Sequence, residues 1–160
     1  MILPPGITIR RATLDDRDRV VHQQIASQDE EARFHPSRER GEAIAGIAWD
    51  LIHQRGGFVL IAEHHGALVG HVGGATTIDP SPFFNADWQH YALIFDLYVL
   101  PSYRRKGIGA ALVSQMLAAL ENLGATRFRI VGLASNPAAL ALYRGLGFAD
   151  YEVTLERNLV

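Results

Sequence analysis

The chain has 160 residues, of which 48% are hydrophobic and 20% are charged, so it is the size of one ordinary domain and can bury a core. Its formal net charge of −2 argues against a nucleic-acid partner, because such binders usually carry a basic excess. The chain contains no cysteine, which excludes disulfides, thiolate nucleophiles and cysteine-containing metal sites.

The sequence also argues against a membrane partner. Its apolar runs fall short of the roughly 18 residues that span a bilayer. The first six residues lack the length and the basic start of a signal peptide. We therefore expect a cytoplasmic protein whose residues 1–160 form a single domain.

The first third of the chain predicts one strand and two helices. Residues 7–10 alternate like a strand, and residues 13–16 combine a hydroxyl with a carboxylate three positions later, which favours a helix start. This helix should run to about Gln28, and residues 29–36 should form a connection. Ser37 can cap a second helix that ends at Gly56.

The middle of the chain predicts a hairpin, a long loop and a buried strand. Residues 58–62 and 68–77 form the two arms of the hairpin. The loop begins at Asp79 and carries Phe83, Phe84 and Trp88, and a loop of this length is often functional. An apolar strand over residues 92–100 follows, and Asp96 interrupts it.

The last third alternates helices and strands. We expect a helix over residues 107–122, a strand over 127–133, a helix that begins at Asn136, and a last strand over 151–155. Hairpins and crossovers are therefore mixed, so the fold class is α/β with a mixed sheet.

The strongest chemical signal is the passage from strand to helix over residues 97–110. The first amides of a helix have no partner inside it and, with the helix dipole, form an anion site. Gly107 and Gly109 let a phosphate approach the main chain closely, and the basic residues 104–106 add positive charge. The loop lacks the third glycine of a dinucleotide motif and the Gly-Lys-Ser/Thr of a P-loop.

This segment resembles the GNAT superfamily of acyl-CoA-dependent N-acyltransferases. Residues 104–109, Arg-Arg-Lys-Gly-Ile-Gly, match the family pattern Arg/Gln-x-x-Gly-x-Gly/Ala, and the preceding Leu97-Tyr98-Val99-x-Pro101 is also typical. The resemblance implies a GNAT-like fold, with a mostly antiparallel sheet of about six to seven strands and about four helices. It also implies acetyl-CoA as cosubstrate.

The resemblance further implies how acetyl-CoA binds. Amides from about Arg105 to Ala110 would hold the diphosphate, and the main chain of residues 97–99 would bond the pantetheine arm. The amide near Leu97 or Tyr98 would polarise the thioester carbonyl, a role worth about 2.7–4 kcal/mol per donor. The expected cofactor-binding residues are Leu97, Tyr98, Val99, Arg104, Arg105, Lys106, Gly107, Ile108, Gly109, Ala110 and Asn136.

A second part of the site is expected at Asn136 and Tyr143. They lie seven residues apart, about two helical turns, so both are on one helix face. The run Ser-Asn-x-x-Ala-x-x-x-Tyr, followed by Gly147-Phe148, resembles GNAT proteins. The resemblance implies that Asn136 contacts pantetheine and that Tyr143 is the acid that protonates the departing thiolate.

The group that removes the proton of the amine is less clearly marked. Many protein-acetylating family members carry a glutamate near the position of Val131. Asp96 is the best candidate base, because an acid in a central strand is costly unless it is paired or functional. It could instead accept bonds from loop amides or from Arg104. Glu63, His71 and His90 are weaker candidates, and a water chain is a further alternative.

The acceptor pocket carries no diagnostic motif. Asp29 and Glu30 could attract a cationic amine, and Phe83 and Phe84 could line a cleft or a dimer contact. A solvated helix end is the more ordinary interpretation of the two acids. The spacing of the seven histidines does not suit a metal site, so we expect no metal.

The resemblance implies an N-acetyltransferase, and the absence of cysteine favours direct transfer of the acetyl group to an amine, without an acyl-enzyme. The favoured acceptor is a small primary amine such as a polyamine, an amino acid or a drug-like amine. One alternative is acetylation of a protein N-terminus or lysine, and another is a non-catalytic acyl-CoA sensor. A homodimer is compatible with the resemblance.

Overall fold

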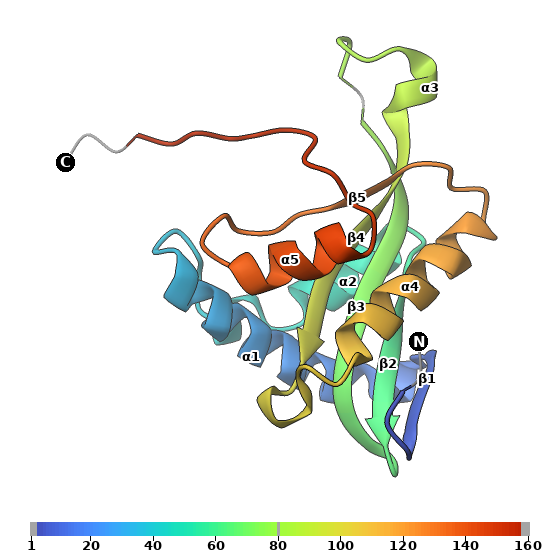
Figure 1. Ribbon diagram of the computed structural model, residues 1–160, viewed down its shortest axis with the longest axis vertical. Coiled ribbons are helices and arrows are strands. Elements are labelled where there is room, and N and C mark those ends of the chain that lie inside the picture. Colours follow the sequence, from blue (N-terminus) through green and yellow to red (C-terminus); the bar gives the residue numbers. More distant parts are fainter. Residues whose placement is uncertain (1–2, 80, 158–160) are drawn as a thin grey trace.

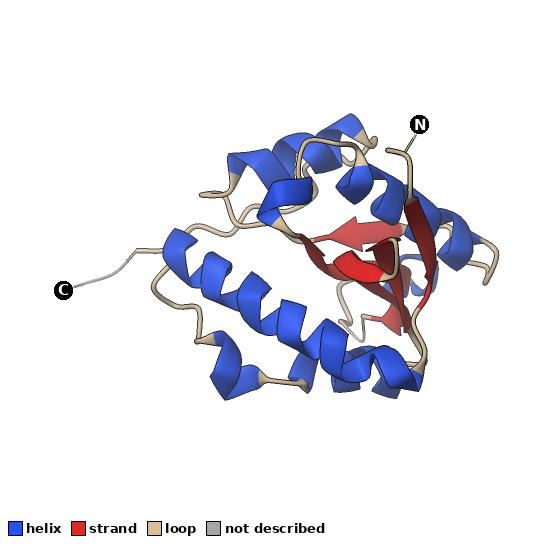
Figure 2. Cartoon of the chain, turned by 90° about the horizontal axis from the view of Figure 1, so that it is seen from below, coloured by secondary structure: helices blue, strands red, loops and turns tan. Residues whose placement is uncertain are grey.

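Over residues 3–79 and 81–157, which the computed structural model describes, the chain forms a five-stranded sheet with helices on both faces (Figures 1 and 2). The strands are β1 (Ile7–Arg11), β2 (Phe58–His64), β3 (Ala67–Ile78), β4 (His90–Val99) and β5 (Phe128–Ile130). The helices are α1 (Arg17–Phe34), α2 (Ile47–Gln54), α3 (Ala86–Gln89), α4 (Ile108–Glu121) and α5 (Pro137–Gly145). Short 3-10 turns lie at η1 (Leu14–Asp16), η2 (Gly41–Ile44) and η3 (Pro101–Tyr103).

The strands follow one another across the sheet in chain order. β1 to β4 are antiparallel neighbours, and β5 pairs with β4 in parallel after the α4 crossover. This arrangement confirms the mixed, mostly antiparallel sheet and the GNAT-like fold. The described strands are slightly fewer than expected.

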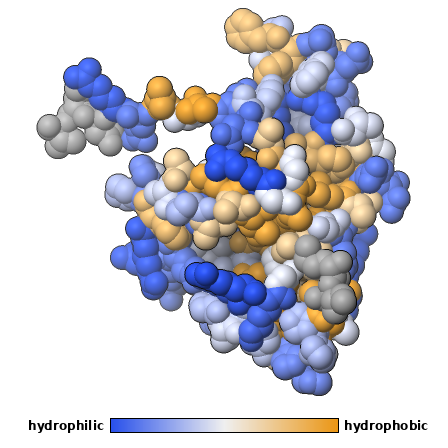
Figure 3. Space-filling view, viewed as in Figure 1, coloured by the Kyte–Doolittle hydropathy of each residue, from blue (hydrophilic) through white to orange (hydrophobic). Residues whose placement is uncertain are grey.

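Each face of the sheet has its own apolar core. Ile108, Leu112 and Met116 of α4 are buried on one face. Trp49 and Ile52 of α2 pack with residues of α1 and β2 on the other face. Figure 3 shows apolar surface across the middle of the face that α4 and α5 form. None of the helices in the described part of the chain has the length and apolarity needed to cross a membrane.

A β-bulge interrupts β4 between Phe95 and Tyr98. Its pairing with β3 shifts between His71↔Tyr98 and Gly73↔Phe95, so two residues of β4 lie opposite one of β3. The sequence predicts that Asp96 faces away from Phe95. Instead, Phe95 packs on the α1–α2 side, and Asp96 bonds Gln24 of α1 on the same side, because the bulge breaks the alternation.

β4 and β5 diverge beyond this bulge. They pair only from Ala92↔Phe128 to Ile94↔Ile130. Among the described residues, no strand pairs with positions 95–99 of β4 on the side away from β3. The sheet is therefore split toward the end of β4, between β4 and the segment that leads to α5.

The early helices differ from the sequence prediction. α1 continues through residues 29–34, which the sequence predicts as a connection, because tertiary contacts hold these acidic residues in the helix. α2 begins only at Ile47, after Gly46 at φ 80°. At Gly41 a Cβ would lie 2.2 Å from the Ile25 carbonyl oxygen, so the chain packs tightly on α1 there instead of forming a continuous helix.

The C-terminal segment is also not the strand that its alternation predicts. Residues 151–155 are extended but unpaired in the described structure, and their apolar side chains are exposed: Tyr151 at 50%, Val153 at 77% and Leu155 at 90%. In Figure 1 this segment runs away from the body of the molecule. An alternating pattern favours a strand, but a strand forms only where a partner edge is available.

Candidate active site

The loop before α4 presents unpaired main-chain amides at the split edge of β4. Arg105 has φ 59° and Gly107 has φ 81°, and together these turn the chain into the helix. The first bond of the helix is donated by the Ala111 amide to the Gly107 carbonyl, at 2.9 Å. Within residues 3–79 and 81–157, the amides from Arg105 to Ala110 have no acceptor. Such a cluster at a helix N-terminus suits a diphosphate.

The surroundings of this loop also fit an anionic ligand. A Cβ built at Gly109 would be in ordinary contact with Leu142 at 3.5 Å and Val99 at 3.7 Å, so the start of α4 lies between the end of β4 and α5. Lys106 Nζ donates to the Ser102 carbonyl at 3.0 Å, and its ammonium group stays exposed. The donor set of amides and basic side chains therefore fits the diphosphate of acetyl-CoA.

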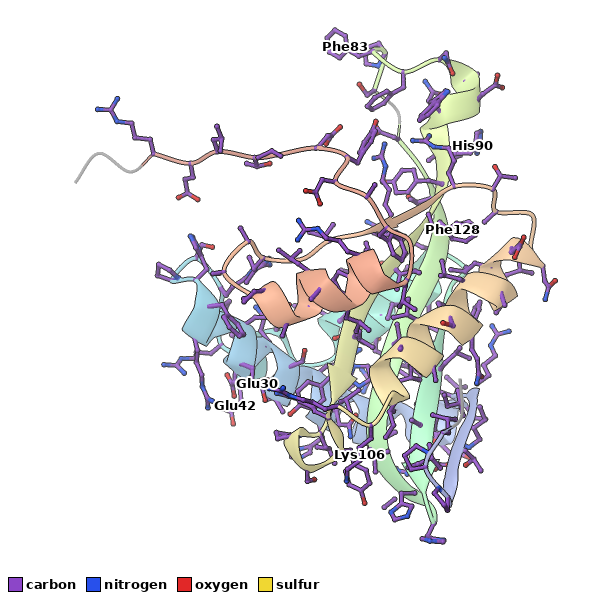
Figure 4. The ribbon with its side chains drawn as sticks, viewed as in Figure 1. Glu30, Glu42, Phe83, His90, Lys106 and Phe128 are labelled. Carbon is purple, nitrogen blue, oxygen red and sulfur yellow. The ribbon has the colours of Figure 1, made fainter. Side chains whose placement is uncertain are left out.

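Arg104 is occupied differently from its loop neighbours. Its Nη2 donates to both carboxylate oxygens of Glu30, at 2.9 and 2.8 Å, and its Nε donates to the Val99 carbonyl at 2.7 Å. Its guanidinium also lies over the Tyr98 ring, 5.4 Å from the centroid. Arg104 thus connects the cofactor loop to α1, and Figure 4 shows Glu30 and Lys106 at the same end of the molecule.

Asp96 lies at the centre of a buried polar network on the α1 face. Its Oδ2 accepts from Gln24 Nε2 and contacts His71 Nε2 at 3.1 Å. His71 is fully buried, and its Nδ1 lies 3.0 Å from Gln23 Oε1. The Nε2 of the same Gln23 side chain donates to the Leu68 carbonyl at 3.0 Å. The acid is therefore held from two elements, α1 and β3.

The orientation of Gln23 defines the proton positions in this network. A carbonyl can only accept, so Gln23 turns Nε2 to Leu68 and Oε1 to His71, which makes His71 Nδ1 a donor. The other ring nitrogen, Nε2, faces Asp96 Oδ2 at 3.1 Å.

Asn136 and Tyr143 lie on α5, on the other side of the split. Asn136 Oδ1 accepts from the Ala139 amide at 3.2 Å and so caps α5. Tyr143 packs edge-on against Phe148, with ring centroids 6.4 Å apart. Burial, and secondarily the charge of Glu31, raises the pKa of Tyr143 to about 12, so the phenol remains a hydrogen-bond donor over the physiological range.

The remaining predicted residues lie in varied surroundings. Asp29 accepts from the Gly41 amide at 3.0 Å. Glu63 is bound by Arg10 and Arg19, which lower its pKa. Val131 is 74% exposed.

The aromatic loop lies far from the rest of the site. Phe83 and His90 are at the end of β4 opposite Lys106 (Figure 4), and Phe84 lies beside Phe83 in the same loop. These two phenylalanines are therefore not brought to the helix N-terminus. Among the described residues, no three or more His, Asp and Glu side chains gather in a metal-binding arrangement.

The sequence pattern does not identify two residues of this network as site residues. Gln23 and Gln24 are both buried, each 5% exposed. The available signal was a pair of polar residues within a helix that also carries the buried Val20. Their partners on β3 and β4 lie far away in the sequence, so the sequence alone could not show the contact.

Comparison with known proteins adds a second line of observation. A ribosomal protein bS18-alanine N-acetyltransferase from Escherichia coli K12 is 42% identical over 67 residues, which cover 42% of this chain and 44% of that enzyme. A mycothiol acetyltransferase from Frankia casuarinae is 32% identical over 157 residues, which cover 93% of this chain and 43% of that enzyme. The chain thus spans less than half the length of either relative.

A solved structure shares the fold across nearly the whole chain. A predicted acetyltransferase from Clostridium acetobutylicum, crystallised with acetyl-CoA, has a TM-score of 0.74 at 17% identity, covering 95% of this chain and 96% of that one. Residues 21–148, which include β4, the loop before α4 and α5, match the family model described as acetyltransferase (GNAT). The chain therefore belongs to the GNAT acetyltransferase family.

Proposed function

We propose that the chain is an acetyl-CoA-dependent N-acetyltransferase whose acceptor is a small primary amine. The observation that carries this proposal is the meeting of two features at one end of the sheet. These are the unpaired amides at the start of α4 and the unpaired edge of β4 at residues 95–99. The first suits a diphosphate, and the second suits an extended amide-containing arm that adds to the sheet like a strand.

Acetyl-CoA would supply an electrophilic thioester carbonyl and a thiolate leaving group. The amides from Arg105 to Ala110 would hold the diphosphate, and the amide of Leu97 or Tyr98 would stabilise the carbonyl oxygen. Asn136, through its free amide nitrogen, would contact the pantetheine arm.

Asp96 and Tyr143 would manage the protons of the reaction. As the amine nitrogen bonds to the acetyl carbon and the carbon–sulfur bond breaks, the amine loses a proton and the sulfur can gain one. Asp96, held by His71 and Gln24, is the acid closest in sequence to the proposed carbonyl-binding amide. Tyr143 is half-buried, and its raised pKa keeps the hydroxyl protonated, so it can donate to the departing sulfur.

An enzyme and a non-catalytic binder differ in a simple assay. We expect thiol release from acetyl-CoA when the protein is mixed with a panel of polyamines, amino acids and aminoglycoside-like amines. Tight CoA binding without release of thiol on any amine or peptide would instead identify a sensor domain. A matched reaction without amine measures background hydrolysis.

Acetylation of a protein N-terminus is the second candidate. The E. coli relative, which acts on an alanine of a ribosomal protein, supports it over the 67 aligned residues. The exposed Val131, where many protein-acetylating members have glutamate, favours the small amine instead. Including peptides that begin with alanine in the acceptor panel separates the two, because the preferred acceptor will show the higher kcat/KM.

A further inference from the structure

Gln24 carries a buried oxygen that no other described residue bonds. The residue is 5% exposed, and its Oε1 has no hydrogen-bond partner within the described structure. Its Nε2, on the same amide, donates to Asp96 Oδ2. An unpaired buried acceptor costs about 1–3 kcal/mol, so its presence beside a candidate catalytic acid calls for a donor ligand.

Asp96 offers a second free acceptor next to it. Oδ2 already receives Gln24 and faces His71, whereas Oδ1 has no bond among the described residues. The carboxylate side chain keeps 13% of its surface exposed. The two free oxygens therefore belong to two groups already in contact, and one nitrogen with several N–H groups can satisfy both.

The position of these oxygens is fixed by the fold. Asp96 has φ 58° at the bulge of β4, which turns its side chain toward α1. His71, whose other ring nitrogen contacts Gln23, and the Nε2 of Gln24 both contact Oδ2, so Oδ1 is the oxygen left for a ligand. Leu97, the next residue, belongs to the unpaired edge proposed for the thioester.

We infer that Gln24 Oε1 and Asp96 Oδ1 form the subsite that binds the acceptor nitrogen, and that this subsite selects a primary amine by its N–H groups. The inference rests on the proposed function. Two N–H groups donated to these oxygens would orient the nitrogen and leave its lone pair for the thioester. Gln24 is thus a substrate-contacting residue, and His71 and Gln23 are positioning residues that act through Asp96.

Because both free oxygens are hydrogen-bond acceptors, the subsite should recognise N–H donors rather than charge alone. This predicts discrimination between two cations of equal charge. n-Butylammonium carries three N–H groups at neutral pH, whereas butyltrimethylammonium carries none. Only the first can satisfy both oxygens.

The test is an NMR titration of the isotope-labelled full chain with each cation, at constant ionic strength. We expect saturable shifts of the Gln24 side-chain amide and the Asp96 main-chain amide with n-butylammonium, and none with butyltrimethylammonium. Equal shifts with both cations, or no shift with n-butylammonium, would overturn the inference. This comparison needs only the wild-type protein, so it does not depend on the folding of a variant.

A substitution then assigns the contact to Gln24. Gln24→Met keeps the volume and removes both polar atoms, and we expect the Kd of n-butylammonium, followed at the Asp96 amide, to rise about tenfold or more. Gln115→Met, at an exposed position of α4, is the matched control and should leave the Kd unchanged. An unchanged Kd in Gln24→Met would exclude Gln24 from the subsite.

Thiol release separates this inference from the proposed function. Turnover of amines without any shift at Gln24 would remove the subsite and keep the acetyltransferase. Saturable n-butylammonium binding at Gln24 without turnover of any amine would keep the subsite and remove the acetyltransferase.

Discussion

At position 96 one backbone angle decides where a candidate catalytic group points. Asp96 has φ 58°, a left-handed conformation that aspartate tolerates better than β-branched residues do. The bulge around it places Phe95 and Asp96 on the same face of the sheet. A regular strand with the same sequence would turn them apart, and the network with Gln24 and His71 would not form.

Tyr143 is expected to act in the chemical step and not in binding. Tyr143→Phe removes the hydroxyl and keeps the ring packed against Phe148. If the hydroxyl protonates the departing sulfur, kcat should fall about 100-fold or more, with acetyl-CoA affinity nearly unchanged. Steady-state kinetics and calorimetric titration of CoA measure the two quantities, and an unchanged kcat would remove Tyr143 from this role.

The pH dependence of the wild-type enzyme gives a related expectation. A raised pKa favours the neutral hydroxyl, so Tyr143 keeps its proton until the pH approaches its pKa of about 12. The alkaline limb of the rate profile should therefore contain no loss of activity centred near pH 10, the ordinary value for tyrosine. A loss at that pH which Tyr143→Phe abolishes would contradict the burial argument.

Among the elements, the start of α4 is the proposed binding site for the diphosphate of acetyl-CoA. Gly109→Glu places a carboxylate among the unpaired amides, where the helix dipole favours it, so the fold should keep its stability. The same charge should repel the diphosphate and raise the acetyl-CoA Kd at least about 100-fold. Gly109→Gln, similar in size but neutral, is the control and should lose less affinity, with less dependence on salt.

The result distinguishes charge from size. An equal loss of affinity in both variants would mean that bulk alone closes the site. An unchanged Kd in Gly109→Glu would place the diphosphate elsewhere. Circular dichroism and thermal unfolding of both variants establish that each is folded.

The junction of η1, α1, β1 and β2 is held by a buried carboxylate. Asp16 is 4% exposed and accepts from Arg10 at 2.7 and 2.9 Å, from Arg19 at 3.1 Å and from Thr13. The Arg10 guanidinium, the largest cause, lowers the pKa of Asp16 well below its ordinary range, and it also lowers the pKa of Glu63.

This cluster should make the protein sensitive to acid. A lowered pKa stabilises the fold above the unfolded carboxyl pKa of about 4, and this stability is lost as pH falls toward the folded pKa. Asp16→Asn should cost about 2–4 kcal/mol at pH 7 and should weaken the pH dependence below about pH 4. Urea unfolding at neutral and acidic pH measures both, and an unchanged acid dependence would show that other carboxylates dominate.

In the molecule as a whole, the split in the sheet separates β4 from α5, so a ligand bound in the split would connect the two sides of the proposed site. β4 belongs to the antiparallel half, whereas α5 follows β5, which pairs with β4 through only three residues. If acetyl-CoA binds between them as proposed, it should stabilise the fold by about 2.7 kcal/mol when free ligand is 100 times the Kd, which thermal unfolding with and without acetyl-CoA measures.

The C-terminal segment should contribute little to the stability of a single chain. Val153 and Leu155 are 77% and 90% exposed, so replacing both with serine should change the unfolding free energy by less than about 0.5 kcal/mol. Leu112→Ala, at a fully buried position of α4, is the contrasting control and should cost about 2–5 kcal/mol.

A larger loss in the serine variant would mean that the segment is covered in solution. Sedimentation of the wild-type and serine variants then identifies the cover. A wild-type dimer that the substitutions convert to a monomer would support the homodimer, whereas a monomer in both cases would indicate packing on the same chain.

Sequence alone predicts the helix N-terminus at Gly107, the cap at Asn136 and the order of the main elements up to α5. These depend on local chemistry, such as glycine conformation, capping and hydrophobic periodicity, and the run over residues 104–109 was specific enough to indicate the family.

The polar contacts around the proposed site depend instead on tertiary packing. The contact among Gln24, His71 and Asp96 joins residues up to 72 positions apart, and the pairing of Arg104 with Glu30 spans 74. Both follow from how α1 packs on a bulged sheet. No local sequence pattern encodes this packing, because it depends on contacts that both faces of the sheet make at the same time. The same reason explains the unpaired alternating segment at residues 151–155, since a strand requires an edge that is available in space.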